Sequence, residues 1–262
     1  MLEFTTFGDV TRLRFSTWRT LAVGYDVSCY LFRGVMIDTA FRHVASELRA
    51  AMNELKPRGV ILSHWHEDHA GNAPEIAQGG TPIWMHQYTE AKLRERQQVK
   101  LYRHFTWGRP RGLHAELTPF DPAPLRVIHT PGHSTDHHVI FDDETRTLFS
   151  ADLWLGVKVR IVGSTENPYE IVESLSRTMA LEPQRMFDAH RGRVDDPVAM
   201  LRAKRDWLVE TIAEIERRLD LGEPEGVIVR EVLGGEERTA FASQFEYSRR
   251  NLVRTVARFR PR

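Results

Sequence analysis

A short apolar strand that ends in a cluster of metal-binding side chains constrains the fold of this chain most. The apolar run 60–62 is followed almost at once by the letters HWHEDH at positions 64–69, which hold three histidines and two acids. Imidazole and carboxylate groups are the ligands that zinc, manganese and iron prefer in proteins. The stretch therefore predicts a metal site at the end of a buried strand.

Strands and helices alternate along most of the chain. Each apolar run with a period of two residues, or a short continuous one, predicts a strand, and each stripe with a period of 3.6 predicts a helix. Strands are expected at 10–15, 27–32, 35–37, 59–62, 82–85, 125–129, 138–141, 147–150 and 185–188, and helices at 42–55, 87–103, from 167, at 196–221 and from 239. This order indicates an α/β fold, in which sites gather at the C-terminal ends of strands.

Composition narrows the classes of protein that fit. No apolar run of the 262 residues approaches the ~20 needed to span a bilayer. The first residues include acids and lack the apolar segment of a signal peptide, so we expect a cytoplasmic protein with no membrane association. The single cysteine, Cys29, lies in an apolar run and is expected to be a buried structural thiol. A formal net charge of zero argues against a global attraction to nucleic acid.

Polar residues also follow other predicted strands. Asp38, His133, Asp152 and His190 each stand where an apolar run ends. Together with the histidines and Asp68 of the 64–69 stretch, His133, Asp152 and His190 make seven candidate ligands, more than one tetrahedral shell uses. Two metal ions that share a carboxylate would use all seven. Asp38 either orients a metal-binding loop or caps the next helix, and the sequence leaves both roles open.

These motifs together resemble those of the metallo-β-lactamase-fold hydrolase superfamily. The resemblance covers about residues 10–192 and rests on Asp38, the His-x-His-x-Asp-His motif at 64–69, the Thr-Pro-Gly-His run ending at His133, Asp152 and His190. It implies a four-layer αββα sandwich formed by residues 1–195, with a lid insertion at 86–122. Residues 196–262 resemble the C-terminal helical appendage of the branch that includes hydroxyacylglutathione hydrolases and beta-lactamase-like protein 2.

The resemblance also implies roles for individual residues. It places two divalent metal ions in the site, with zinc favoured over iron and manganese. One ion would be held by three histidines and the other by a mixed set, with Asp152 as the bridge; the sets are His64, His66 and His133, and Asp68, His69 and His190. Asp68 would also act as a catalytic residue that orients a metal-bound hydroxide or passes a proton to the leaving group. Asp38 and His137 would support the ligands from behind.

The function implied is hydrolysis of a small ester, thioester or lactone. A phosphodiesterase or ribonuclease is an alternative, because basic residues cluster at 92–111 and 249–262. A mononuclear iron dioxygenase acting on a persulfide is a second alternative on the same ligand set. A binding protein that has kept the fold is a third and less favoured one, since no ligand is missing.

The substrate is expected to be a small molecule, with RNA less favoured. Lys158, Arg160 and Arg191 are candidate contacts to an anionic group, although Arg191 has Asp195 as an alternative partner. The basic and aromatic residues of 92–111 form either a solvated face or a lid over an anionic substrate. Relatives commonly carry Gly where this chain has Ala151. The sequence does not fix the oligomeric state, and a homodimer is compatible with it.

Overall fold

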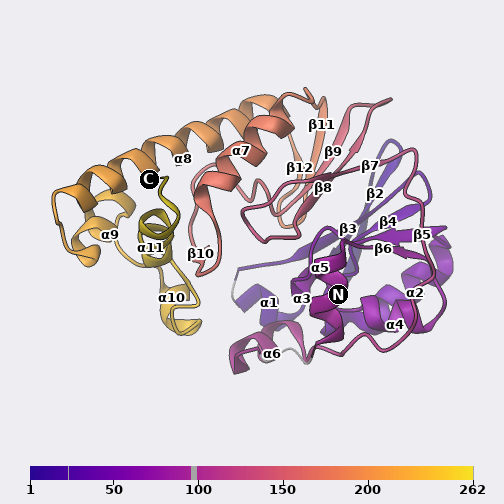
Figure 1. Ribbon diagram of the computed structural model, residues 1–262. Coiled ribbons are helices and arrows are strands. Elements are labelled where there is room, and N and C mark those ends of the chain that lie inside the picture. Colours follow the sequence, from indigo (N-terminus) through magenta and orange to yellow (C-terminus); the bar gives the residue numbers. More distant parts are fainter. Residues whose placement is uncertain (23, 96–98, 262) are drawn as a thin grey trace. The chain divides into compact units, whose positions relative to one another are not determined.

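The computed structural model describes residues 1–22, 24–95 and 99–261. The chain forms two compact units (Figure 1). Unit 1 comprises Met1–Val127 and Ile140–Asp142, and unit 2 comprises Ile128–Val139 and Asp143–Arg262. Neither boundary between the units falls between residues 195 and 196, where the predicted domains meet. The division into a catalytic domain and a C-terminal helical extension stays a prediction.

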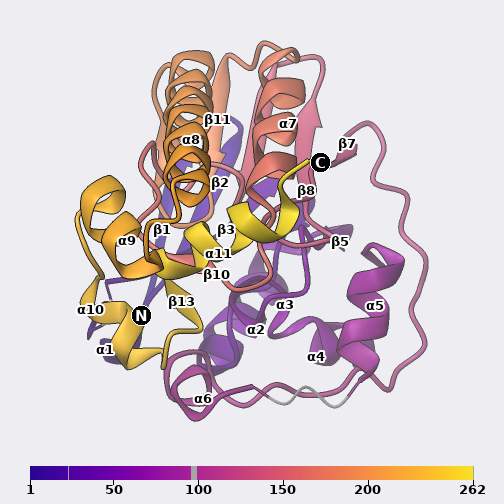
Figure 2. The same ribbon diagram turned by 60° about the vertical axis from the view of Figure 1, so that its left-hand side comes forward.

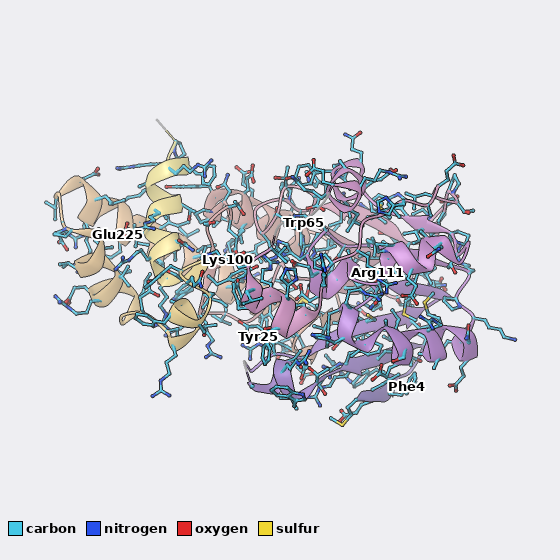
Figure 3. All side chains as sticks on the ribbon, turned by 90° about the horizontal axis from the view of Figure 1, so that it is seen from below. Phe4, Tyr25, Trp65, Lys100, Arg111 and Glu225 are labelled. Carbon is cyan, nitrogen blue, oxygen red and sulfur yellow. The ribbon has the colours of Figure 1, made fainter. Side chains whose placement is uncertain are left out.

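Unit 1 contains a six-stranded mixed sheet in sequence order. Its strands are β1 (Leu2–Phe7), β2 (Val10–Phe15), β3 (Val27–Phe32), β4 (Val35–Ile37), β5 (Gly59–Ile61) and β6 (Ile83–Trp84). The first four pair antiparallel, and β4, β5 and β6 pair in parallel. The prediction missed β1, an edge strand whose Phe4 is 48% exposed (Figure 3). Because an edge strand buries so little, its residues carry no clear apolar alternation.

The helices of unit 1 are short. They are α1 (Trp18–Ala22), α2 (Ala45–Leu55), α3 (Glu67–Ala70), α4 (Ala73–Gln78), α5 (Gln87–Arg94) and α6 (Leu101–Trp107), with a 3-10 turn at Arg42–Val44. Leu48 of α2 packs in the core with Leu13, Phe15 and Cys29 of the sheet. Cys29 is buried, as expected, and burial raises the pKa of its thiol.

The predicted helix at 87–103 was wrong as a single helix. The structure ends α5 at Arg94, where Glu95 has an extended backbone, and starts α6 at Leu101. Residues 96–98 lie outside the described part of the chain. Continuing the buried stripe of Thr89 and Leu93 would put polar residues in the core, which explains why the helix stops. Lys100, directly before α6, and Arg111, beyond its end, are exposed (Figure 3).

The second large sheet has five strands, and most of its residues belong to unit 2, while residues 126–127 and 140–142 belong to unit 1. Its order is β12 (Gly192–Val194), β11 (Arg185–Asp188), β9 (Thr147–Ala151), β8 (His138–Asp142) and β7 (Arg126–His129). Between β9 and the parallel β11, the chain passes through α7 (Pro168–Met179). Asn167 caps α7 as predicted, because its side chain accepts hydrogen bonds from the Tyr169 and Glu170 amides. The prediction did not include β12.

The C-terminal helices complete unit 2. The predicted helix at 196–221 is confirmed as α8 (Pro197–Asp220), which lies beside α7 (Figure 2). After it come α9 (Glu225–Leu233), α10 (Arg238–Ala242) and α11 (Arg249–Phe259). One continuous helix from 239 was wrong: Gln244 and Phe245 have positive φ, and β13 (Tyr247–Ser248) pairs with β10 (Val162–Gly163) before α11 begins. The α/β class with C-terminal helices is confirmed.

Among the described residues, no helix is both long and apolar enough to cross a bilayer. The cytoplasmic location stays a prediction.

Candidate metal centre

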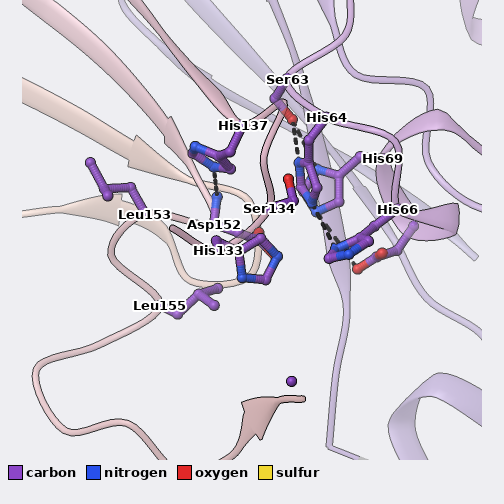
Figure 4. Close-up of polar contacts among 12 residues, drawn as sticks. Ser63, His64, His66, His69, His133, Ser134, His137, Asp152, Leu153 and Leu155 are labelled. Carbon is purple, nitrogen blue, oxygen red and sulfur yellow. Dashed lines mark hydrogen bonds and ion pairs between the residues drawn. The ribbon is translucent and has the colours of Figure 1, made fainter. Parts of the chain in front are cut away.

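Four candidate ligands lie together after β5 in unit 1. This unit 1 cluster consists of His64, His66, Asp68 and His69, and its backbone turns from the strand directly into α3. The Nε2 atom of His64 lies 3.0 Å from Nδ1 of His66 (Figure 4). The Nε2 atom of His69 lies 3.6 Å from a carboxylate oxygen of Asp68. His64 and His69 are fully buried, so their ring nitrogens are shielded from solvent.

Asp38 fixes the orientation of two of these imidazoles. Its carboxylate accepts hydrogen bonds from the Ser63 amide at 2.8 Å and the Ser63 hydroxyl at 2.9 Å, and lies 2.8 Å from Nδ1 of His69. Because the Ser63 hydrogen points to Asp38, its oxygen accepts from Nδ1 of His64 at 3.0 Å. Both histidines thus carry a proton on Nδ1 and a lone pair on Nε2. Asp38 does not cap a helix, since the 3-10 turn begins after Phe41.

Three more candidate ligands lie together in unit 2. This unit 2 cluster consists of His133, Asp152 and His190. One carboxylate oxygen of Asp152 lies 3.3 Å from Nε2 of His133, and the other lies 3.3 Å from Nε2 of His190. Two imidazoles that face the two oxygens of one carboxylate form the pattern expected around a bridging ligand.

His137 supports Asp152 from behind. Its Nε2 atom accepts a hydrogen bond from the Asp152 amide at 3.1 Å (Figure 4). Its Nδ1 atom lies 3.2 Å from the carbonyl oxygen of Thr130 and 2.9 Å from the Thr130 hydroxyl. Both ring nitrogens are thus occupied within unit 2, which ties the strand end at Thr130 to the strand end at Asp152.

Two acids that the sequence did not single out, the buried Asp188 and the partly buried Glu166, also contact the unit 2 cluster. Asp188 accepts hydrogen bonds from the amides of His190 and Arg191, both at 2.9 Å, and from the Leu155 amide at 3.0 Å. Glu166 lies 3.6 Å from Nδ1 of His133. Burial raises the pKa of both carboxyl groups. Neither acid belongs to a spaced motif, and only the position of Asp188 at a strand end hinted at its role.

A lysine from α8 was also missed. Lys204 is buried and donates hydrogen bonds to the carbonyl oxygens of Leu153, at 2.8 Å, and Trp154. Burial lowers the pKa of its ammonium group to about 8. The sequence did indicate a buried charge here, because Lys204 lies on the apolar stripe of the helix between Leu201 and Leu208. This helix therefore holds the turn directly after Asp152.

The predicted substrate contacts have mixed surroundings. Lys158 is exposed, and Arg160 is 63% exposed with a carboxylate oxygen of Glu237 at 4.0 Å. Arg191 donates from Nε to the carbonyl oxygen of Leu155 at 3.2 Å. It does not pair with Asp195, which instead lies 3.4 Å from Arg193. Substrate binding by these three cations stays a prediction.

Most of the basic clusters are neutralised by acids. In α11 and its end, four arginines pair with acids and one stacks on an aromatic ring; they are Arg249 with Glu237, Arg250 and Arg254 with Glu225, Arg260 with Asp220, and Arg258 on Phe259. In the 92–111 cluster, Lys92, Arg94, Arg103 and Arg111 also have acidic partners. Arg96 and Arg262 lie outside the described residues. This pairing favours a solvated face over a nucleic-acid surface.

The donor chemistry of both clusters fits a divalent metal. Each cluster offers imidazole nitrogens and carboxylate oxygens without a thiolate, the set that suits zinc, manganese or iron. In the unit 1 cluster, ligand atoms of His64 and His66, and those of Asp68 and His69, lie within 4.8 Å of each other. In the unit 2 cluster the same holds for Asp152 with His133 and for Asp152 with His190. Hydrogen bonds to Asp38, Ser63 and Asp188 hold the candidate ligands His69, His64 and His190 in place. Ligands in metal sites are commonly held by such neighbouring groups.

A family model matches most of the chain. The model described as the metallo-beta-lactamase superfamily matches residues 22–206. The beta-lactamase-like protein 2 homolog of Drosophila melanogaster is 31% identical in an alignment of 191 residues that covers 64% of this chain and 58% of the fly protein. An atrochrysone carboxyl ACP thioesterase of Pseudocercospora fijiensis is 29% identical over 97 residues, 37% of this chain and 25% of that protein. The matches cover little more than half the length of the fly protein and of a lactamase-like protein of Aspergillus niger.

Solved structures share the fold. A metallo-beta-lactamase family protein from Thermus thermophilus superimposes with a TM-score of 0.63 at 18% identity, covering 88% of this chain and 86% of that one. An archaeal superfamily protein from Sulfolobus tokodaii gives a TM-score of 0.54 at 22% identity, covering 70% and 80%.

Proposed function

The chain belongs to the metallo-beta-lactamase superfamily, and from this premise we propose that it is a metal-dependent hydrolase. Its reaction would use the unit 1 cluster and the unit 2 cluster together. The observation that carries the proposal is Asp152, whose two carboxylate oxygens each face the Nε2 atom of a different histidine. A carboxylate in that position could offer one oxygen to each of two metal ions.

We assign the ligands as the resemblance implies. One divalent ion would be held by His64, His66 and His133, and the other by Asp68, His69 and His190, with Asp152 between them. Zinc is the ion that we propose first, because it needs no redox chemistry and prefers this donor set. Bound there, the ions would supply Lewis acidity and lower the pKa of a coordinated water to near neutrality.

The protein's own groups then orient and move protons. Asp38 accepts a hydrogen bond from Nδ1 of His69, and Ser63 accepts one from Nδ1 of His64, so the Nε2 lone pairs of both rings would be available to bound metal ions. Asp68 lies beside Nε2 of His69 and is proposed to accept a proton from the attacking water and return it to the leaving group. Arg191, Lys158 and Arg160 are proposed contacts for an anionic part of the substrate.

A thioester is the substrate class that we propose first, ahead of a small ester or lactone. Two relatives, from Pseudocercospora fijiensis and Passalora fulva, are named as atrochrysone carboxyl ACP thioesterases. They are 29% and 26% identical to this chain over 97 and 160 residues. An acyl thioester, an aryl ester and a lactone should therefore be compared side by side.

The test is turnover of these three substrates by protein loaded with zinc, manganese or iron. We expect hydrolysis that a chelator lowers by at least about 100-fold and that added zinc restores. Asp152→Asn should lose activity to a similar extent, whereas Arg217→Met, at an exposed ion pair of α8, should not. Activity that survives complete chelation would refute the proposal. A phosphodiester substrate and an oxygen-consumption assay of iron-loaded protein test the two enzymatic alternatives.

A further inference from the structure

An arginine of α6 reaches the metal-binding motif from outside it. Arg103 donates from Nη2 to Oε2 of Glu67, the residue between His66 and Asp68. The side chains are only 7% and 3% exposed. Arg103 belongs to the segment 86–122, more than thirty positions along the chain from the motif. The pair thus links the predicted lid insertion to the first turn of α3 within unit 1.

The motif helix depends on such tertiary contacts. A helix of four residues is too short to hold its own geometry. Gly71, at its end, packs so closely that a Cβ atom there would lie 2.8 Å from the carbonyl oxygen of Ala40. The carboxylate of Asp38 contacts Nδ1 of His69, and Arg103 forms an ion pair with Glu67. Each contact fixes one residue of a turn that carries two candidate ligands.

Helix α6 is seated on the same part of unit 1. The ring of Trp107 lies edge-on to Phe41 with centroids 5.2 Å apart, and Nε2 of His43 lies 3.0 Å from the carbonyl oxygen of Phe105. The segment 40–43 therefore supports both α6 and the end of α3. A shift of α6 would move Arg103 relative to Glu67.

We propose that Arg103 is a positioning residue whose buried ion pair with Glu67 holds α3 in the geometry that binds metal, and so couples the lid segment to the metal centre. This inference rests on the proposed function. Removing one member of a buried ion pair leaves the other charge uncompensated, which the neighbouring backbone must move to relieve. The residues that would move with Glu67 are its direct neighbours, His66 and Asp68.

The chain offers a matched control in the same segment. Arg94 pairs with Glu90 at 2.8 Å on α5, but its side chain is 40% exposed. An exposed pair of this kind contributes little and can be replaced by water. Arg94→Met and Arg103→Met therefore remove the same group from the same insertion and differ mainly in burial and in contact with the motif.

The experiment measures cobalt and zinc affinity by chelator competition, together with the visible spectrum of the cobalt protein. Arg103→Met and Glu67→Gln should each weaken binding by about 10- to 100-fold and alter the cobalt spectrum. Arg103→Lys keeps the positive charge but lacks the planar guanidinium group, so it should recover part of the metal affinity lost in Arg103→Met.

Arg94→Met should match the metal affinity and the cobalt spectrum of the unmodified protein. The double variant Arg103→Met, Glu67→Gln should lose no more than the worse single one, as expected for coupled residues.

Several results would overturn the inference. If Arg103→Met lowers thermal stability but leaves the metal affinity and the cobalt spectrum unchanged, the ion pair is only structural. Losses that add in the double variant would show that the residues act separately. If Arg103→Met does not fold, Arg103→Lys and Glu67→Gln decide the question by the same readouts. A protein without substitutions that binds no metal would instead overturn the proposed function.

Discussion

At the scale of single residues, Ala151 stands out among the neighbours of the candidate ligands. Its φ is 43°, in the left-handed region, directly before Asp152. A Cβ atom makes that conformation unfavourable by roughly 1–2 kcal/mol. Glycine, which the family resemblance leads one to expect at this place, would adopt the same backbone angle without that cost. The chain thus carries backbone strain directly before Asp152, the carboxylate that we propose as the bridge.

We expect Ala151→Gly to stabilise the protein. The change should raise the free energy of unfolding by up to about 1 kcal/mol, because the strain relieved exceeds the entropy that glycine adds to the unfolded chain. Ala213→Gly, at an exposed position inside α8, should lower it by about 1 kcal/mol. Urea unfolding monitored by circular dichroism measures both. If Ala151→Gly instead lowers the free energy of unfolding, the backbone at Ala151 is not strained.

Residue types and spacing were enough to find the candidate ligands, but not their supporting groups. His64, His66, Asp68 and His69 share one local motif, so their grouping in unit 1 follows from the chain itself. Glu166 reaches His133 from a loop, and Arg103 reaches Glu67 from another helix. Such contacts depend on tertiary packing, which no local pattern encodes.

At the scale of elements, α8 is more than an appendage on the sheet of unit 2. Lys204 binds the carbonyl oxygens of Leu153 and Trp154, and the indole of Trp154 donates to the carbonyl oxygen of Met200 at 3.1 Å. The helix and the turn after Asp152 therefore support each other from both sides. Sequence alone indicated the helix and its ends, but not this contact.

The buried lysine gives α8 a pH dependence that can be measured. Burial lowers the pKa of Lys204 from 10.5 to about 8 in the folded protein. Between these values the unfolded chain binds the proton and the folded chain does not, so the free energy of unfolding rises with pH. From pH 8 to 10 the metal-free protein should gain about 2–3 kcal/mol relative to Lys204→Met.

Urea unfolding at several pH values in the presence of a chelator measures this gain. Lys158→Met, at an exposed lysine of the same unit, is the matched control. If the difference between the native protein and Lys204→Met stays constant from pH 8 to 10, Lys204 does not lose its proton in the folded state.

Elements were predicted well where a buried stripe ran through them and poorly where it stopped. The strands of both sheets that lie between neighbours were found, whereas β1 and β12 at the sheet edges were missed. Two helices were drawn too long, at 87–103 and from 239. In the second, apolar residues continue across the break at Gln244 and Phe245, so the local pattern hides a change in backbone direction.

At the scale of the whole molecule, the candidate ligands are shared between two compact units. The unit 1 cluster comes from residues 64–69, and the unit 2 cluster from three strand ends far apart in the sequence. The fold class and family could be inferred from the sequence because the ligands appear in a characteristic order. The unit boundaries could not, because residues 140–142 belong with the first unit, a contact that only the folded chain defines.

The stoichiometry of bound metal is the most direct test of a two-ion centre bridged by Asp152. Zinc-loaded protein, freed of excess metal, should contain about two divalent ions per chain by elemental analysis. Asp152→Asn should retain one or fewer, because the proposed bridge is lost while the other ligands remain. A native protein that retains no zinc, or an Asp152→Asn variant that still holds two ions with unchanged affinity, would contradict the account.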